Sequence, residues 1–121
     1  MMIEKAATEV FCTLQIDGLH NWPECPFEEM KILRELHRHM FHIKAYKRVT
    51  HSDRDVEFII LKHQISKWLR ENYWNNELNS HLFGRMSCET IAELLHKQFD
   101  LSGCEVSEDN ENGSYTRWEA T

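Results

Sequence analysis

The chain has 121 residues, of which 41% are hydrophobic and 28% charged, and its formal net charge at pH 7 is −6. This length and composition are typical of one folded domain, residues 1–121, and exclude a disordered chain. The negative charge disfavours a nucleic-acid partner, because a phosphate backbone attracts basic surfaces, but a locally basic pocket can still bind a small anion.

The cysteines and the hydrophobic pattern indicate the compartment. Four cysteines are present: Cys12, Cys25, Cys88 and Cys104. Their spacing contains no CxxC pair, so it indicates neither a zinc knuckle nor a disulfide framework. No apolar run approaches the ~20 residues of a membrane-spanning helix, and the first residues lack the apolar core of a signal peptide. We therefore expect a soluble, cytoplasmic protein with reduced thiols and no membrane partner.

Hydrophobic periodicity predicts the secondary structure of the first half of the chain. Alternating apolar and polar residues predict strands at residues 10–19 and 37–49, joined by an irregular loop that contains both prolines. Apolar residues at steps of three and four then predict a helix, with the stripe Phe58, Leu61, Ile65, Trp68 and Leu69. The Asn-rich stretch 72–86 predicts a polar connection without regular structure.

The residue pattern of the second half of the chain predicts a helix and a hairpin. Ser87 is expected to cap a second helix, whose apolar stripe is Ile91, Leu94, Leu95 and Phe99. A short strand at 104–107, a turn at Asn112-Gly113 and a returning strand at 115–118 follow. The order β-β-α-α-β-β predicts a two-layer α+β domain with a four-stranded antiparallel sheet, both helices on one face, and open edges that oligomerisation can cover.

Two histidines open the second predicted strand. His37 and His39 lie two residues apart, so they share one face of the strand, and the alternate residues that follow them are apolar. His20 ends the strand that is expected to pair with this one, so three imidazoles can converge on one ion. Three histidine ligands without a fourth protein ligand are typical of a catalytic zinc site, which keeps a position open for water or substrate.

The HxH spacing alone is a weak signal. In a chain with eight histidines such a pair arises readily by chance, and the spacing alone favours partly exposed histidines at a strand end over a metal site. The remaining histidines show no ligand spacing and are expected at the surface: His42, His51, His63, His81 and His96.

Five short motifs follow one another along the chain: "LQIDGLHNW", "LHRHMF", "VEFIILK", "SCETIAELL" and "CEVSEDNENGSY". Together they resemble those of the 6-pyruvoyl-tetrahydropterin synthase / 6-carboxytetrahydropterin synthase family. "LQIDGLHNW" resembles the family's strand that ends in its first zinc histidine, and "LHRHMF" resembles its HGH motif, with Arg38 in place of glycine. "VEFIILK", "SCETIAELL" and "CEVSEDNENGSY" resemble the starts of its two helices and its C-terminal hairpin. The resemblance covers most of the chain. It implies the tunnelling fold, in which the sheets of several subunits join into a barrel, and hence a homo-oligomer built from trimers, up to a hexamer.

The resemblance also implies roles for individual residues. The three histidines match the family's zinc ligands, and Glu108 matches the glutamate that anchors its pterin ring. A carboxylate can accept two parallel N–H bonds from the pyrimidine edge of a pterin or guanine. Ser87 and Cys88 fall where the family places residues close to the ring. Without the resemblance, Glu108 is a solvated hairpin carboxylate like Asp109, Ser87 only a helix cap and Cys88 a small thiol.

The chain departs from the family at the catalytic residues. Leu33 occupies the position of the catalytic cysteine, and no Asp-His pair follows the first predicted helix. Proton abstraction needs a positioned base, and the candidates are Cys25, Glu35 and Cys88. Arg54, at the entrance of the first helix, is a candidate contact for a phosphate or carboxylate tail, although a simple surface pair with Asp53 or Asp55 explains it better.

Two functions are compatible with these residues. The first is a zinc-dependent lyase or hydrolase that acts on a pterin or purine triphosphate derivative, with zinc as the Lewis acid. The second is a module that has lost its base and binds or sequesters a guanine-like base or nucleotide. An open metal position favours the enzyme, and the missing catalytic residues favour the module. A structural subunit without a ligand is a third alternative.

Overall fold

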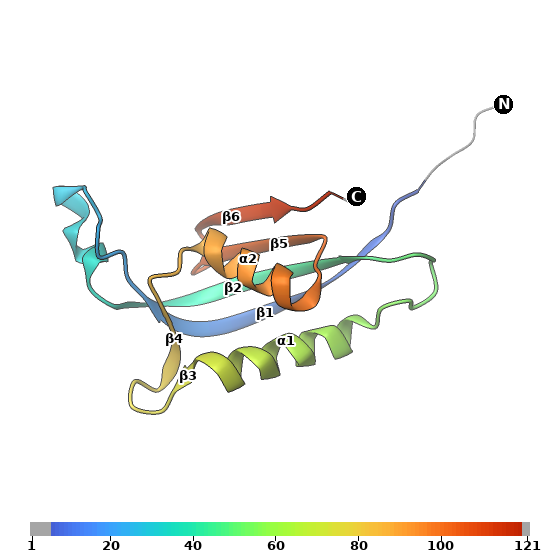
Figure 1. Ribbon diagram of the computed structural model, residues 1–121, viewed down its shortest axis with the longest axis horizontal. Helices are drawn as coiled ribbons and strands as arrows, with labels where there is room; N and C mark the ends of the chain where they lie inside the picture. The colour runs from blue at the N-terminus through green and yellow to red at the C-terminus, as the bar shows by residue number, and fades with distance from the viewer. Residues whose placement is uncertain (1–5, 120–121) are drawn as a thin grey trace.

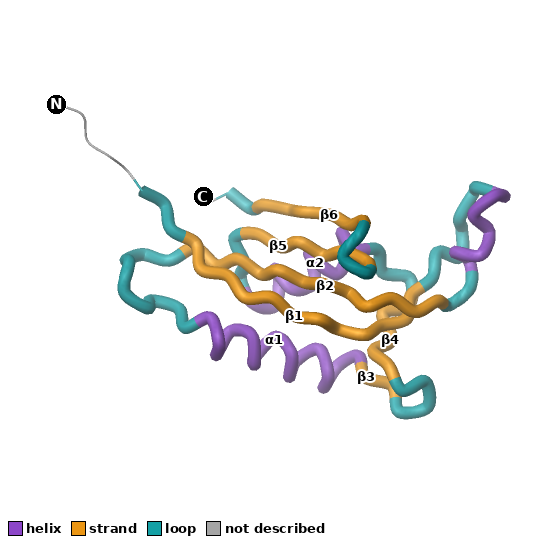
Figure 2. The backbone as a smooth tube through the Cα atoms, turned by 180° about the vertical axis from the view of Figure 1, so that it is seen from behind, coloured by secondary structure: helices purple, strands orange, loops and turns teal. Residues whose placement is uncertain are grey.

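The architecture is a six-stranded sheet with α-helices packed against one face (Figures 1 and 2). The computed structural model describes residues 6–119, and every statement about the fold concerns this range. The strands are β1 (Glu9–His20), β2 (His37–Arg48), β3 (Trp74–Asn75), β4 (Ser80–Gly84), β5 (Gly103–Glu108) and β6 (Asn112–Arg117). The helices are the 3-10 helix η1 (Glu28–Arg34) and the α-helices α1 (Phe58–Tyr73) and α2 (Cys88–Phe99).

The layers are clear from the two opposite views. The strand order is β3-β4-β1-β2-β5-β6. Figure 1 shows α2 in front of the central strands, and Figure 2 shows the same strands in front of α2. Helix α1 packs against β1 and β4, and α2 against β5 and β6. The loop that contains η1 extends away from the sheet, at the end where β1 stops and β2 begins (Figure 1).

The long antiparallel pair β1–β2 confirms the two predicted N-terminal strands. Its register places His20 opposite His37 and Ile16 opposite Phe41. Alternate residues of β2 from Phe41 to Ala45 are buried, as the period-two pattern predicts. The two histidines of β2 therefore belong to the row of side chains that faces the core. Gly18 is required in this pair, because a Cβ there would lie 2.6 Å from the ring of Phe83.

The stretch 72–86 is not a connection without regular structure, because it contains the two short strands β3 and β4. These strands bring the described sheet to six, so the prediction of a four-stranded antiparallel sheet is wrong. Strand β4 pairs in parallel with β1, so the sheet is mixed. The class, α+β with the α-helices on one face, is as predicted.

Both α-helices lie where the apolar spacing predicts them. The buried residues of α1 are Leu61, Ile65 and Leu69, but Phe58 is 48% exposed and does not belong to the stripe. Ser87 caps α2 as expected, because its Oγ accepts a hydrogen bond from the backbone N–H of Thr90 at 3.2 Å. Within residues 6–119, no helix is both long and apolar enough to cross a membrane.

The C-terminal hairpin is present, but its turn lies earlier than predicted. Asp109 and Asn110 have positive φ angles of 55° and 58° and form the turn, whereas Asn112 and Gly113 already belong to β6. Gly113 is required for close packing instead, since a Cβ there would lie 2.2 Å from the carbonyl oxygen of Val106. The shift places Glu108 at the end of β5, opposite Phe41 of β2.

His81 is buried, contrary to the expected surface position. It belongs to β4, which lies between β1 and β3, and only 7% of the residue is exposed. Its Nδ1 is 2.9 Å from the carbonyl oxygen of Asp17, and its Nε2 is buried without a hydrogen-bond partner among the described residues. Burial lowers the pKa of His81, and the bond to Asp17 opposes this shift only in part.

Acidification is expected to destabilise the fold through His81. The unfolded imidazole binds a proton near its ordinary pKa of 6.5, whereas the folded one binds it only at lower pH. The contribution of the neutral His81 side chain to the free energy of unfolding is therefore fully present above pH 6.5. It is lost as the pH falls through the folded pKa, and the free energy of unfolding then changes by at most about 1.4 kcal/mol per pH unit.

Urea unfolding at pH 7, 6 and 5 measures this slope. His81→Asn keeps a donor for the carbonyl oxygen of Asp17 but does not titrate, so its free energy of unfolding should depend less on pH than that of the wild type. His63→Asn, at an exposed position of α1, should leave the slope unchanged. Equal slopes for the wild type and His81→Asn would contradict the prediction.

Candidate metal centre

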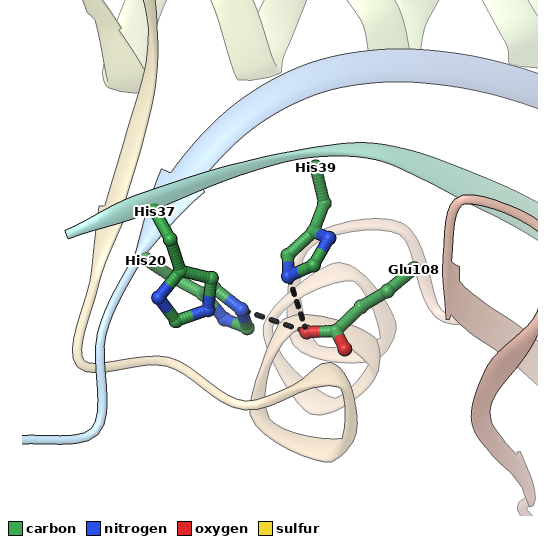
Figure 3. A group of neighbouring side chains, drawn as sticks. All are labelled: His20, His37, His39 and Glu108. Atoms are coloured by element: carbon green, nitrogen blue, oxygen red, sulfur yellow. Dashed lines mark ion pairs between the residues drawn. The ribbon is translucent and has the colours of Figure 1, made fainter. Parts of the chain in front are cut away.

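Four side chains converge at the end of the sheet from which the η1 loop extends (Figure 3). They are His20 of β1, His37 and His39 of β2, and Glu108 of β5, and their potential ligand atoms lie within 4.8 Å of one another. The strand register produces this convergence. His20 pairs with His37, while Glu108 pairs with Phe41, which follows His39 in the same row.

Each of the three imidazoles is held by a hydrogen bond at its Nδ1 atom. The acceptors are the carbonyl oxygen of Met86 for His20 (2.9 Å), the carbonyl oxygen of Glu35 for His37 (2.9 Å), and Oδ2 of Asp109 for His39 (2.7 Å). Because all three partners are acceptors, they favour the tautomer in which the proton of a neutral ring lies on Nδ1 and the lone pair on Nε2. Three preoriented Nε2 lone pairs are the ligands that a metal ion needs.

The surroundings of His20 Nε2 also fit a bound cation. This atom lies 2.7 Å from Oε2 of Glu108, yet it is buried and forms no hydrogen bond among the described residues. Oε2 of Glu108 is also 3.5 Å from Nε2 of His39. Burial lowers the pKa of His20, against the opposing effects of its bond to Met86 and the charge of Glu108. A lone pair and a carboxylate oxygen repel at this distance, and a divalent ion held by the three Nε2 atoms would offset this repulsion.

A cavity of about 470 Å³ opens beside the cluster. This volume is in the range of small-molecule sites. Its lining includes His20, His37 and Glu108 from the cluster, and Ser87 and Cys88 from the start of α2. The structure therefore brings the predicted ring-contacting residues to the same place as the histidines.

Cys88 is placed at the cavity but is a weak base. Burial, followed by the negative charges of Glu108 and Glu89, raises the pKa of its thiol to about 12. The thiol is therefore protonated near neutral pH, and the thiolate, which is the reactive form, is scarce. Ser87 caps α2 through its Oγ, as expected, and also lines the cavity.

The other two candidate bases lie outside the cavity lining. Cys25 is buried, with 2% of the residue exposed, and its Sγ points to backbone carbonyl oxygens of its own loop. Glu35 has an exposed side chain and reaches the cluster only through its backbone, by accepting the hydrogen bond from His37.

Arg54 lies far from the cluster. It follows β2, whereas His37 begins that strand, and a 12-residue strand spans about 36 Å. The Arg54 guanidinium is exposed and lies 2.6 Å from the carboxylate of Asp53, the surface pair that the sequence also allowed.

Several residues at the site were not assigned to it from the sequence. Asp109 is exposed, as expected, yet His39 donates a hydrogen bond to it, and this bond, followed by that from the backbone N–H of Met40, lowers the pKa of its carboxyl. Trp22 and Arg85 also line the cavity, although they are far apart in the sequence. The only local signal for Asp109 was its position directly after Glu108.

The site therefore combines a four-residue group that can hold a metal ion with a cavity of ligand size. Both belong to the end of the sheet where β1, β2 and β5 meet the start of α2. Function has to be argued from this geometry, because a fold alone does not specify it. Models of known protein families give no match to this chain, and a search of curated proteins gives no similar sequence.

Proposed function

We propose that this chain is a zinc-dependent enzyme of the 6-pyruvoyl-/6-carboxytetrahydropterin synthase type that acts on a pterin or purine triphosphate derivative. The observation that carries the proposal is the convergence of three Nδ1-anchored imidazoles beside a cavity of about 470 Å³. Zinc is the proposed metal because three histidines with an open position are typical of catalytic zinc sites. The motif order of the sequence supports the pterin-like ligand.

Glu108 is proposed to connect the metal centre and the ligand. One of its carboxylate oxygens lies against the imidazoles, while the other points away from them (Figure 3). The free oxygen is able to accept an N–H bond from the edge of a pterin or guanine ring. Bound zinc would supply Lewis-acid polarisation of a substrate oxygen.

Trp22 and Arg85 are proposed to hold the rest of the ligand. Both line the cavity, and Trp22 is 44% exposed, so its ring is available for stacking on a bicyclic base. Arg85 forms an exposed ion pair with Glu24. A phosphate tail can replace this carboxylate, since a guanidinium binds either group through paired N–H bonds. Arg85 thus takes the role that the sequence assigned to Arg54.

We further propose that the chain assembles into a homo-oligomer built from trimers. The order of the described sheet makes β3 and β6 its outer strands, and an outer strand presents backbone groups that can pair with another chain. Tyr115, on β6, is 52% exposed. The family resemblance supports closure of such pairs into a barrel.

One observation favours the second candidate function, a module that binds a guanine-like ligand without converting it. Leu33, at the position of the family's catalytic cysteine, lines the cavity with an apolar side chain. The thiol of Cys88 is held protonated, and Cys25 does not line the cavity. The enzyme therefore needs a base other than Cys25, Glu35 and Cys88.

Native mass spectrometry followed by turnover assays tests the proposal. The purified protein is expected to be an oligomer built from trimers, with about one zinc ion per chain, as in catalytic three-histidine sites. Incubation with dihydroneopterin triphosphate or GTP should then consume the ligand only when zinc is present. Binding with full recovery of the unchanged ligand would support the module instead. Protein that takes up neither metal nor ligand would contradict both functions.

A further inference from the structure

Asp109 joins the C-terminal hairpin to the metal centre through both oxygens of its carboxylate. Oδ1 accepts a hydrogen bond from the backbone N–H of Met40 at 3.0 Å, and Oδ2 lies 2.7 Å from Nδ1 of His39. The backbone N–H of Asp109 in turn donates to the carbonyl oxygen of Met40 at 2.8 Å. The residue is thereby fixed against β2, one position after Glu108.

We propose that Asp109 is a positioning residue that selects the tautomer of His39 and thereby sets the metal affinity of the centre. This inference rests on the proposed zinc site. An acceptor at Nδ1 requires the ring proton there and leaves the Nε2 lone pair free for the metal. His20 and His37 obtain the same bond from backbone carbonyl groups, so His39 is the ligand among the three whose tautomer depends on a side chain.

A purely structural role for Asp109 makes a different prediction. The residue has a φ of 55° and accepts from Met40, so it could serve only to cap the end of the hairpin. Asparagine performs that role equally well, because it tolerates the left-handed conformation and its side-chain oxygen can accept the same N–H bond. It fails at His39, because the amide nitrogen that replaces Oδ2 is a donor.

Asp109→Asn therefore separates the two roles. In the metal-free variant, His39 is expected to change from the Nδ1–H to the Nε2–H tautomer, which long-range ¹H–¹⁵N correlation spectra of the imidazoles resolve. Zinc affinity, measured by competition with a chromophoric chelator, should fall by about 10–100-fold, the usual effect of losing an outer-shell partner. Urea unfolding should show little change.

Two further variants complete the test. Glu111→Gln removes the same charge from an exposed position of the same hairpin and should change neither the tautomer nor the affinity. Asp109→Ala, which loses both side-chain bonds, should weaken zinc binding even if the amide of the asparagine variant turns. The proposal is overturned if both Asp109 variants keep the Nδ1–H tautomer and bind zinc as the wild type does.

Failure of the proposed function is distinguishable from failure of this inference. If the wild-type protein binds no zinc, the proposed metal-dependent function fails. The tautomer of His39 in metal-free protein is measurable all the same, and a change in Asp109→Asn but not in Glu111→Gln would still assign the control of this ring to Asp109.

Discussion

Replacement of His20 by alanine is expected to abolish metal binding. His20 is the most buried of the three histidines, with 8% of the residue exposed, and its Nε2 lies closest to Oε2 of Glu108. Zinc per chain, measured by elemental analysis after dialysis, should fall from about one to near zero, because the site loses one of its three imidazoles. The variant should also lose the metal-dependent rise in stability, which is about 4 kcal/mol when zinc is present at about 1,000 times its Kd.

The control for this experiment is His63→Ala, which removes an exposed histidine from α1. It should retain the zinc content of the wild type and the full stabilisation by added metal. If His20→Ala and His63→Ala bind zinc equally, the ion is held elsewhere and the assignment of the metal centre is wrong. Circular dichroism of both metal-free variants shows whether a loss of zinc reflects the site or the fold.

Replacement of Phe41 by alanine is expected to lower the free energy of unfolding by about 3–5 kcal/mol, the usual cost of removing a buried aromatic ring. Phe41 is 0% exposed, and its ring packs edge-on against those of His20, His39 and Phe83. The same substitution should weaken zinc binding by the folded protein, because two of the imidazoles lose the surface against which they pack.

Phe58→Ala provides the matched control, since this phenylalanine is 48% exposed at the start of α1. Its effect on stability should remain within about 0.5 kcal/mol, as is usual for surface substitutions. Chemical unfolding followed by tryptophan fluorescence measures both variants. A loss at Phe41 no larger than that at Phe58 would show that Phe41 is not a central core residue.

The parts of the fold that depend on local pattern were predictable from the sequence. The alternation along β1 and β2 gave their extents and the face on which His37 and His39 lie. The hydroxyl of Ser87 marked the start of α2, because capping is a local interaction. The turn of the hairpin was misplaced, because Asp109-Asn110 and Asn112-Gly113 both suit positive φ angles.

The strands β3 and β4 were missed because the pairing that joins them to the rest of the sheet, between β4 and β1, is not local. Strand β4 pairs with β1, more than sixty residues earlier in the chain, through contacts such as that between Gly18 and His81. Strand β3 has two residues and β4 has five, too few for a clear alternation. The burial of His81 follows from this pairing, so it could not be predicted either.

At the candidate site, the sequence identified the residues that bear chemical groups but not the atoms that orient them. His20, His37 and His39 were predicted from spacing and strand pairing together with the family resemblance, and the structure brings them together. The backbone acceptors for His20 and His37 have no sequence signature, because every residue has a carbonyl oxygen. Arg54 was assigned to the ligand without knowledge of its distance from the histidines, which the length of β2 makes large.

These backbone acceptors also affect how far the sequence can diverge while the metal centre persists. Positions 35 and 86 orient two of the histidines through main-chain oxygens, so this orientation does not require a particular side chain at either position. Only a few positions, chiefly the three histidines and their carboxylate partners, then need particular side chains for the proposed metal centre. A distant homologue could preserve the same ligand geometry with little else of its sequence in common. Searches based on spatial arrangement should therefore find its relatives more readily than searches based on sequence identity.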